Sequence, residues 1–155
     1  MRVSTQIYII HDGNWLMLLR NKKSNDVNHD KWIAVGGKLE KDESIGQCAK
    51  REMKEETGFT ADELVLQGIV EFHYPHLEDE LIYVYTCSRF HGTCTECSEG
   101  TLAWIKEEDI LSLNLWEGDR IFLKKMLAHE EQTFHLKLYY NDHDVLIDVQ
   151  SMGEI

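Results

Sequence analysis

The chain has 155 residues, which suits one domain and is long enough to bury about two-thirds of its unfolded surface. Its 16 lysines and arginines stand against 28 aspartates and glutamates, so the formal net charge is −12. This balance excludes the basic surface on which polynucleotide binding depends. A free nucleotide is still compatible with it, because a divalent metal can offset phosphate charge.

Residues 1–10 alternate between apolar and polar positions and lack the long apolar core and small-residue cleavage site of a targeting segment. No uninterrupted apolar run reaches membrane-spanning length. Without an export signal, the four cysteines are expected to be reduced thiols. We therefore expect a cytoplasmic protein with no membrane partner.

Two strand-like segments open the chain, at residues 3–10 and 15–20. The link at 11–14 contains an Asp-Gly pair, which tolerates the positive φ angles of a tight turn, so the two segments are predicted to form a hairpin. The polar, turn-rich stretch 21–30 predicts a mobile surface loop. Residues 32–35 are predicted to form a short strand.

The next element is an amphipathic helix at residues 45–57. Ser44 and Gln47 have the spacing of a capping box, in which each side chain bonds the backbone of the other residue. Gly58 is suited to the left-handed conformation that ends a helix.

The remaining segments continue the alternation of strands and helices. We predict strands at 64–74, 80–87 and 102–105, helices at 107–111 and 117–129, and a closing hairpin of 134–140 with 145–149. One proline, no repeat and no linker indicate a single α/β domain over residues 1–155, with a mixed sheet between helices.

The helix at 45–57 carries acidic residues on its apolar side. At about 100° per residue, Glu52 and Glu56 fall beside Ile45 and Ala49, and Glu55 borders the same face. Like charges at these spacings repel by about 0.2–0.5 kcal/mol even when exposed, and more when buried. A positive group is therefore expected next to them.

Arg51 is close enough to orient one of these carboxylates, but one guanidinium cannot offset three. Magnesium or manganese, which prefer oxygen ligands, fits the remaining charge. The alternative is a solvated acidic face, with Cys48, Ala49 and Met53 making the buried contact instead.

The sequence around this helix resembles the Nudix box, at residues 37–59. Its defining positions are filled by Gly37, Glu43, Arg51, Glu52, Met53, Glu55, Glu56, Gly58 and Phe59. The resemblance implies a Nudix-type α/β/α sandwich with a mixed sheet. It also implies a hydrolase that uses Mg²⁺, with Mn²⁺ as a substitute, to attack the diphosphate bond of a nucleotide.

Site roles follow from the same resemblance. Glutamates matching Glu52, Glu55 and Glu56 hold the metal, and a backbone carbonyl at Gly36 or Gly37 joins them. Residues matching Glu43 and Arg51 orient these ligands. A glutamate from a later loop serves as a further ligand or base, for which Glu99 is the first candidate and Glu96 the second, against the alternative of a solvated acid.

The chain is also similar to MutT-type oxidised-purine nucleoside triphosphatases. The matching segments are Lys31-Trp32, Gly92-Thr93 and Leu115-Trp116. In that subfamily the tryptophan matching Trp116 stacks on the purine and the acid matching Asp119 bonds the base edge. This implies 8-oxo-dGTP as the leading substrate, with Lys23 and Lys38 available for phosphate.

Two positions depart from the subfamily. Ile33 stands where members that read the purine edge often carry asparagine, and Gly118 stands where some carry a second acid. Loss of an amide removes a contact that gives large discrimination. Other Nudix substrates therefore stay open: a sugar nucleotide, a dinucleoside polyphosphate or dihydroneopterin triphosphate.

Two further classes of function compete with the hydrolase. His91, Cys94 and Cys97 with Cys87 would be an irregular zinc site, since structural zinc usually has two separated ligand pairs. The alternative is ordinary reduced thiols, and no cysteine has the context that activates a nucleophile. A non-catalytic nucleotide sensor would typically have lost box carboxylates, which this chain keeps.

Overall fold

A computed structural model describes residues 1–23 and 25–153 of the chain. Ser24, in the predicted loop, and residues 154–155 lie outside the described residues. The elements in chain order are β1 (Arg2–His11), β2 (Asn14–Leu19), β3 (Trp32–Ile33), β4 (Val35–Lys38), α1 (Ile45–Thr57), β5 (Phe59–His73), β6 (Glu80–Gly92), β7 (Thr101–Lys106), the 3₁₀ helix η1 (Glu107–Ser112), α2 (Glu117–Leu127), β8 (Phe134–Tyr140) and β9 (Leu146–Ser151).

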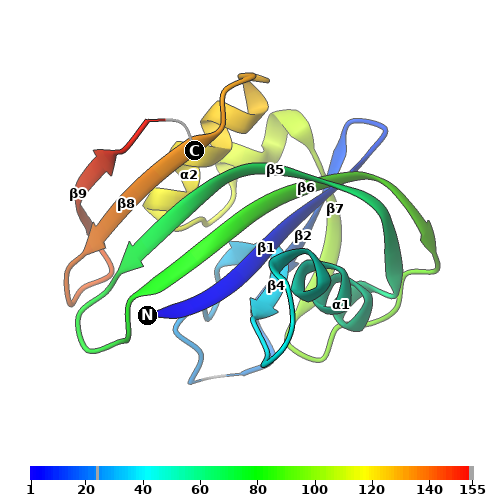
Figure 1. Ribbon diagram of the computed structural model, residues 1–155, viewed down its shortest axis with the longest axis horizontal. Helices are drawn as coiled ribbons and strands as arrows, with labels where there is room; N and C mark the ends of the chain where they lie inside the picture. Colours follow the sequence, from blue (N-terminus) through cyan, green and yellow to red (C-terminus); the bar gives the residue numbers. More distant parts are fainter. Residues whose placement is uncertain (24, 154–155) are drawn as a thin grey trace.

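The strands form one mixed sheet in the order β3-β2-β1-β6-β5-β8-β9, with β4 also paired to β1 and β7 to β2. The pairs β1 with β6 and β5 with β8 are parallel, and the others are antiparallel. Figure 1 shows the long strands β1, β6 and β5 running side by side through the molecule. The two predicted hairpins, β1 with β2 and β8 with β9, are confirmed.

The two helices cover opposite faces of the sheet. Thr5 of β1 contacts Cys48 of α1, with 3.6 Å between the hydroxyl and the sulfur. Tyr8 packs edge-on against Phe122 of α2, with ring centroids 6.4 Å apart. Because Thr5 and Tyr8 are three residues apart on one strand, their side chains point to opposite faces. The predicted α/β/α sandwich is confirmed (Figure 1).

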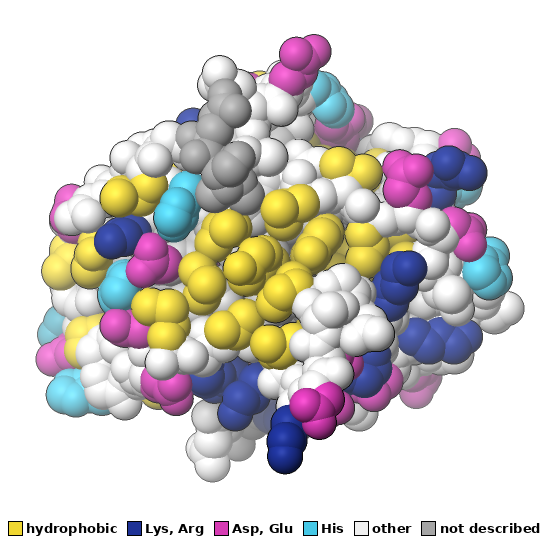
Figure 2. Space-filling view, viewed as in Figure 1, with side chains coloured by type: hydrophobic (Ala, Val, Ile, Leu, Met, Phe, Trp, Pro, Cys, Tyr) yellow, Lys and Arg dark blue, Asp and Glu magenta, His cyan; other side chains and the backbone are white. Residues whose placement is uncertain are grey.

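Helix α1 covers only part of its face. Tyr83 and Tyr85 of β6 pair with Thr5 and Ile7 of β1 and therefore point to the same side as Thr5. Both are only partly buried. Figure 2 shows hydrophobic side chains gathered over the central strands of this face.

The ends of α1 are as predicted. The Ser44 hydroxyl accepts a hydrogen bond from the Gln47 amide at 3.1 Å, and the Gln47 side chain accepts one from the Ser44 amide at 2.9 Å. Gly58 ends the helix with φ 85°. These capping contacts fix where α1 begins and ends. They therefore also fix the positions along the helix of the glutamates in its last two turns.

Several boundaries differ from the prediction. Strands β5 and β6 extend to Phe59 and Gly92, because their polar ends pair with each other across β-bulges although they lack apolar alternation. The predicted strand at 32–35 divides at Ala34 into β3 and β4, and η1 is 3₁₀. Helix α2 ends at Leu127, and His129 has φ 55°. In the part of the chain that the structure describes, no helix is long and apolar enough to span a membrane.

Candidate active site

The buried carboxylate of α1 is Glu56, which is 9% exposed. One of its oxygens accepts a hydrogen bond from the Gly36 amide of β4 at 2.9 Å. The carboxylate of Glu52, one turn earlier, lies against Gly37, where a Cβ atom would come within 2.4–2.6 Å of it. The two glycines therefore allow the backbone of β4 to approach both carboxylates, as the predicted inward orientation of Glu52 and Glu56 requires.

Arg51 holds the outer acids of the helix. Its guanidinium donates two hydrogen bonds to Glu43, at 2.6 and 3.0 Å, and single bonds to Glu52 at 2.8 Å and to Glu55 at 3.3 Å. This bidentate pairing lowers the pKa of Glu43 to about 2. No hydrogen bond joins Arg51 to Glu56 among the described residues. The positive charge of Arg51 therefore does not compensate the negative charge of the Glu56 carboxylate.

The later-loop acid that meets this helix is Glu99. Its carboxylate lies close enough to Glu56 to raise the pKa of Glu56. It is paired with Arg20 at 3.1 Å and with Lys23 at 3.7 Å, and Arg20 in turn donates to Asp26 at 2.6 Å. Glu96, the second sequence candidate, is exposed and lines none of the cavities described below.

Burial and mutual repulsion disfavour charge on this acidic cluster. Burial is the main cause that raises the pKa of Glu56 to about 8, with Glu99 and Glu52 adding to it and the Gly36 amide opposing it. Burial also raises the pKa of Glu52, against the influence of Arg51. A nearby cation would relieve both effects.

The donor set fits a hard divalent cation. Glu52, Glu56 and Glu99 line one cavity and offer carboxylate oxygens, the ligands that Mg²⁺ prefers. Within residues 1–23 and 25–153, no three acidic, histidine or cysteine side chains are already arranged as metal ligands. Arg51 and Arg20 hold Glu52 and Glu99 in ion pairs instead.

Two adjoining cavities make up the site. The acidic cavity, about 390 Å³, contains the three glutamates, Gly36, Gly37 and Lys38. The second cavity, about 200 Å³, has a mixed wall in which Phe72 and Trp116 are the aromatic side chains. The cavities adjoin each other, since six residues line both of them: Arg2, Gln6, Val27, Asn28, Ile33 and Glu80.

Trp116 forms one wall of the second cavity but is only 3% exposed. Its indole N–H donates to Asn28 at 2.7 Å, and the ammonium of Lys31 lies 5.1 Å from its ring centroid. Phe72 and Tyr140 pack nearly perpendicular to it. The ring is therefore held rigidly at the cavity wall.

Asp119, at the base of this cavity, is 5% exposed. Burial raises its pKa to about 7, against the attraction of Lys31. Near neutral pH the carboxyl group therefore exists in both protonation states, and can either donate or accept a hydrogen bond.

The structure explains the glycine at position 118. A Cβ atom there would come within 2.5 Å of Leu138 and 2.6 Å of the Tyr140 hydroxyl. The Gly118 amide donates to that hydroxyl at 2.6 Å. Tyr140 thus occupies the space that a second acid would need.

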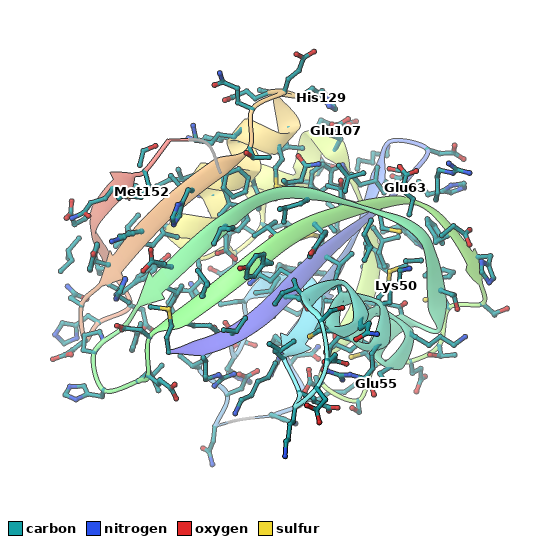
Figure 3. The ribbon with its side chains drawn as sticks, viewed as in Figure 1. Lys50, Glu55, Glu63, Glu107, His129 and Met152 are labelled. Carbon is teal, nitrogen blue, oxygen red and sulfur yellow. The ribbon has the colours of Figure 1, made fainter. Side chains whose placement is uncertain are left out.

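The remaining predicted residues lie at the edges of the site. Glu55 is 59% exposed and lines neither cavity, and Figure 3 shows it at the lower edge of α1, away from Lys50. Lys23 is also 59% exposed and pairs with Glu99. Lys38 is exposed at the rim of the acidic cavity, and Ile33 lies where the cavities join. The Gly37 carbonyl faces the Thr5 hydroxyl and the Cys48 thiol.

The residues of the site that sequence reasoning missed include Gln6, Arg20, Asp26, Asn28 and Phe72. One signal was present in the strand at 3–10, where Ser4, Thr5 and Gln6 follow one another. Three successive polar residues make both faces of a strand polar, which is unusual for a strand otherwise rich in buried apolar residues.

The cysteines remain free thiols and do not assemble with His91 as zinc ligands in the described parts of the chain. Cys87 and Cys97 are buried, and Cys94 is exposed. His91 instead contacts Asp62 at 2.8 Å. Burial raises the pKa of Cys48, Cys87, Cys94 and Cys97.

Comparison with known proteins places this site in a family. The NUDIX domain family model matches residues 1–126. The chain is 29% identical to the oxidized purine nucleoside triphosphate hydrolase of Mus musculus over 133 residues, which cover 84% of this chain and 83% of that protein. It is 30% identical to the CTP pyrophosphohydrolase of Escherichia coli (strain K12) over 122 residues, or 77% and 87% of the two chains.

A solved structure shares the fold of this chain. The crystal structure of the mutator MutT protein from Bacillus halodurans matches this structure with a TM-score of 0.87 and 24% identity, over 98% of each chain. The family model covers most of the chain, and the motif at 37–59 supplies two carboxylates of the acidic cavity, those of Glu52 and Glu56. This protein belongs to the NUDIX domain family of hydrolases.

Proposed function

We propose that this Nudix hydrolase converts a nucleoside triphosphate, with an oxidised purine base as in 8-oxo-dGTP, to the monophosphate and pyrophosphate. The observation that carries the proposal is the position of an acidic cavity beside a second cavity lined by Phe72, Trp116 and Asp119. A nucleotide has the same division into a charged phosphate chain and a flat base.

Divalent metal is implied at the acidic end. Nudix hydrolases generally use divalent cations, and Glu52, Glu56 and Glu99 would hold one here. When bound, such a cation neutralises phosphate oxygens and promotes attack by water. Glu55, which the box assigns to the metal, would act from the rim of this cluster.

The protein's own residues position these acids. Arg51 fixes Glu43 and Glu52 relative to the helix, and Gly36 fixes Glu56 relative to the sheet. With one Glu56 oxygen bonded to Gly36, the other is left for the cavity. Without a cation, Glu56 with its pKa of about 8 would hold a proton at neutral pH, and a bound cation would favour the charged carboxylate that serves as a ligand.

At the other end, Phe72 and the small exposed part of the Trp116 ring line the cavity that a base would enter, and Asp119 offers a hydrogen bond to the edge of the base. Lys38 lies at the rim of the acidic cavity, where a phosphate chain would enter. The identity to an oxidized purine nucleoside triphosphate hydrolase supports this choice of base. The 30% sequence identity with a CTP pyrophosphohydrolase makes CTP the rival substrate.

The test is a panel of 8-oxo-dGTP, dGTP, CTP, dihydroneopterin triphosphate, a dinucleoside polyphosphate and a sugar nucleotide. Each is assayed with Mg²⁺ for release of phosphate and of pyrophosphate. We expect pyrophosphate from 8-oxo-dGTP with the highest kcat/KM. A higher kcat/KM for CTP or a sugar nucleotide would refute the proposed substrate, and binding without turnover would favour a nucleotide sensor.

A further inference from the structure

Gln6 lines the site and carries an unpaired buried acceptor. It lies on β1, opposite Gly36 of β4 and Val84 of β6, so its backbone is fixed between two strands. Its Oε1 atom is buried and has no hydrogen-bond partner in the described part of the chain. Because an unsatisfied buried acceptor costs roughly 1–3 kcal/mol, such an atom calls for an explanation.

The side chain of Gln6 lies where the two cavities meet. It lines both of them, as Ile33 does. Gln6 and Tyr8 are two residues apart on β1, so both point to the α2 side of the sheet, where Trp116 and Asp119 are found. Gln6 therefore supplies a carboxamide to the region that Ile33 also lines, where the isoleucine side chain supplies none.

A carboxamide suits the edge of an oxidised purine. It presents one acceptor, Oε1, beside one donating group, Nε2. Guanine offers two acceptors, N7 and O6, along its major-groove edge. Oxidation at C8 places a hydrogen on N7, so the same edge then offers a donor next to a carbonyl, which pairs with both atoms of an amide.

We infer that Gln6 is a specificity-determining residue, whose carboxamide reads the N7–H and O6 edge of an 8-oxopurine in place of the amide absent at position 33. The inference rests on the proposed function. It assigns the preference for an oxidised base to β1, whereas Trp116 and Asp119 hold any purine.

The experiment measures binding of two monophosphates, 8-oxo-dGMP and dGMP, by calorimetry. Neither contains a diphosphate bond, so turnover does not interfere. The variants are Gln6→Met, which keeps the length of the side chain and removes the amide, and Gln6→Glu, which keeps its shape and an acceptor but replaces the donor. The control is Ile10→Met, on the same face of β1 but outside both cavities.

We expect the wild type to bind 8-oxo-dGMP more tightly than dGMP. Gln6→Met should weaken 8-oxo-dGMP by roughly 10- to 100-fold and dGMP by less than about threefold. Gln6→Glu should weaken 8-oxo-dGMP by at least about tenfold, because its oxygen would face O6, and Ile10→Met should match the wild type. Thermal unfolding checks the fold of each variant, and Gln6→Glu carries the test if Gln6→Met does not fold.

Equal weakening of both monophosphates, or no change in either Gln6 variant, would overturn the assignment of Gln6. A wild type that binds both monophosphates equally would overturn it as well. The proposed function is judged separately by the turnover panel. Turnover of 8-oxo-dGTP with unchanged selectivity in the Gln6 variants would refute only the role of Gln6.

Discussion

The Gly36 amide of β4 donates a 2.9 Å hydrogen bond to the Glu56 carboxylate at the end of α1. This contact joins the sheet to the helix at the acidic cavity. Gly36 has φ 151° and lies so close to β1 that a Cβ atom would come within 1.9 Å of the Thr5 carbonyl oxygen. The position of Glu56 is thus set by a backbone approach that only glycine permits.

Replacement of Glu56 by glutamine is expected to lower kcat by more than about 100-fold with the fold intact. The amide can still accept the Gly36 hydrogen bond, but it has no charge to offer a cation. Removal of a buried charge should leave the melting temperature at pH 8 equal to or above that of the metal-free wild type. Kinetics with Mg²⁺ and calorimetric melting curves measure both effects.

Glu55→Gln is the matched comparison, since Glu55 is on the same helix turn but is 59% exposed. We expect a smaller loss of kcat than for Glu56→Gln, and a smaller decrease in the rise of melting temperature that Mg²⁺ produces in the wild type. A larger loss from Glu55→Gln would show that the exposed acid, and not the buried one, is the main ligand.

The two glycines of β4 should respond differently to alanine. Gly36→Ala places a methyl group against backbone and is expected to destabilise the protein by more than about 2 kcal/mol. For Gly37→Ala, the three atoms nearest to the added methyl group all belong to the movable end of Glu52, so this variant should unfold at nearly the wild-type urea concentration and yet lose activity. Activity loss in proportion to stability loss for both variants would contradict this separation.

Glu99→Gln should lower kcat/KM by at least about tenfold, because Glu99 lies beside Glu56 in the acidic cavity. Glu96→Gln, three residues earlier on the same loop and exposed, is the control and should retain wild-type kinetics. Because Glu99 also pairs with Arg20, melting curves are needed to show that the loop keeps its place. Equal effects of the two substitutions on kcat/KM would contradict a role of Glu99 in the activity.

The features that the sequence predicted well are local ones. Ser44, Gln47 and Gly58 determine both ends of α1 through contacts within a few residues, so the faces of Glu52 and Glu56 follow from helical geometry alone. The family resemblance added Trp116 and Asp119, which are far from the box in sequence but lie in one cavity.

The features that were missed depend on long-range packing. Arg20 and Glu99 are 79 residues apart, and Trp116 and Asn28 are 88 apart. The local sequence pattern around each of these residues does not indicate that the two members of a pair are in contact. The stretch at 21–30 was predicted as a surface loop from its composition, but Asp26 and Asn28 form part of the cavity wall because Arg20 and Trp116 bond to them.

Stability should depend on pH through Asp119. Burial raises the pKa of this carboxyl group from 3.8 to about 7 in the folded protein. The folded state therefore binds the proton more tightly than the unfolded state does. The stabilising contribution of this proton is complete below about pH 3.8 and is lost as the pH rises to about 7.

Asp119→Asn removes the charge that the folded protein must bury above pH 7. We expect its melting temperature to exceed that of the wild type by several degrees at pH 8, with the difference shrinking steadily towards pH 4. Asp109→Asn, at an exposed position on η1, should leave the pH dependence of the wild type unchanged. A difference between Asp119→Asn and wild type that is the same at every pH would mean that the substitution acts through packing, since a lost charge acts only where the wild-type carboxyl is ionised.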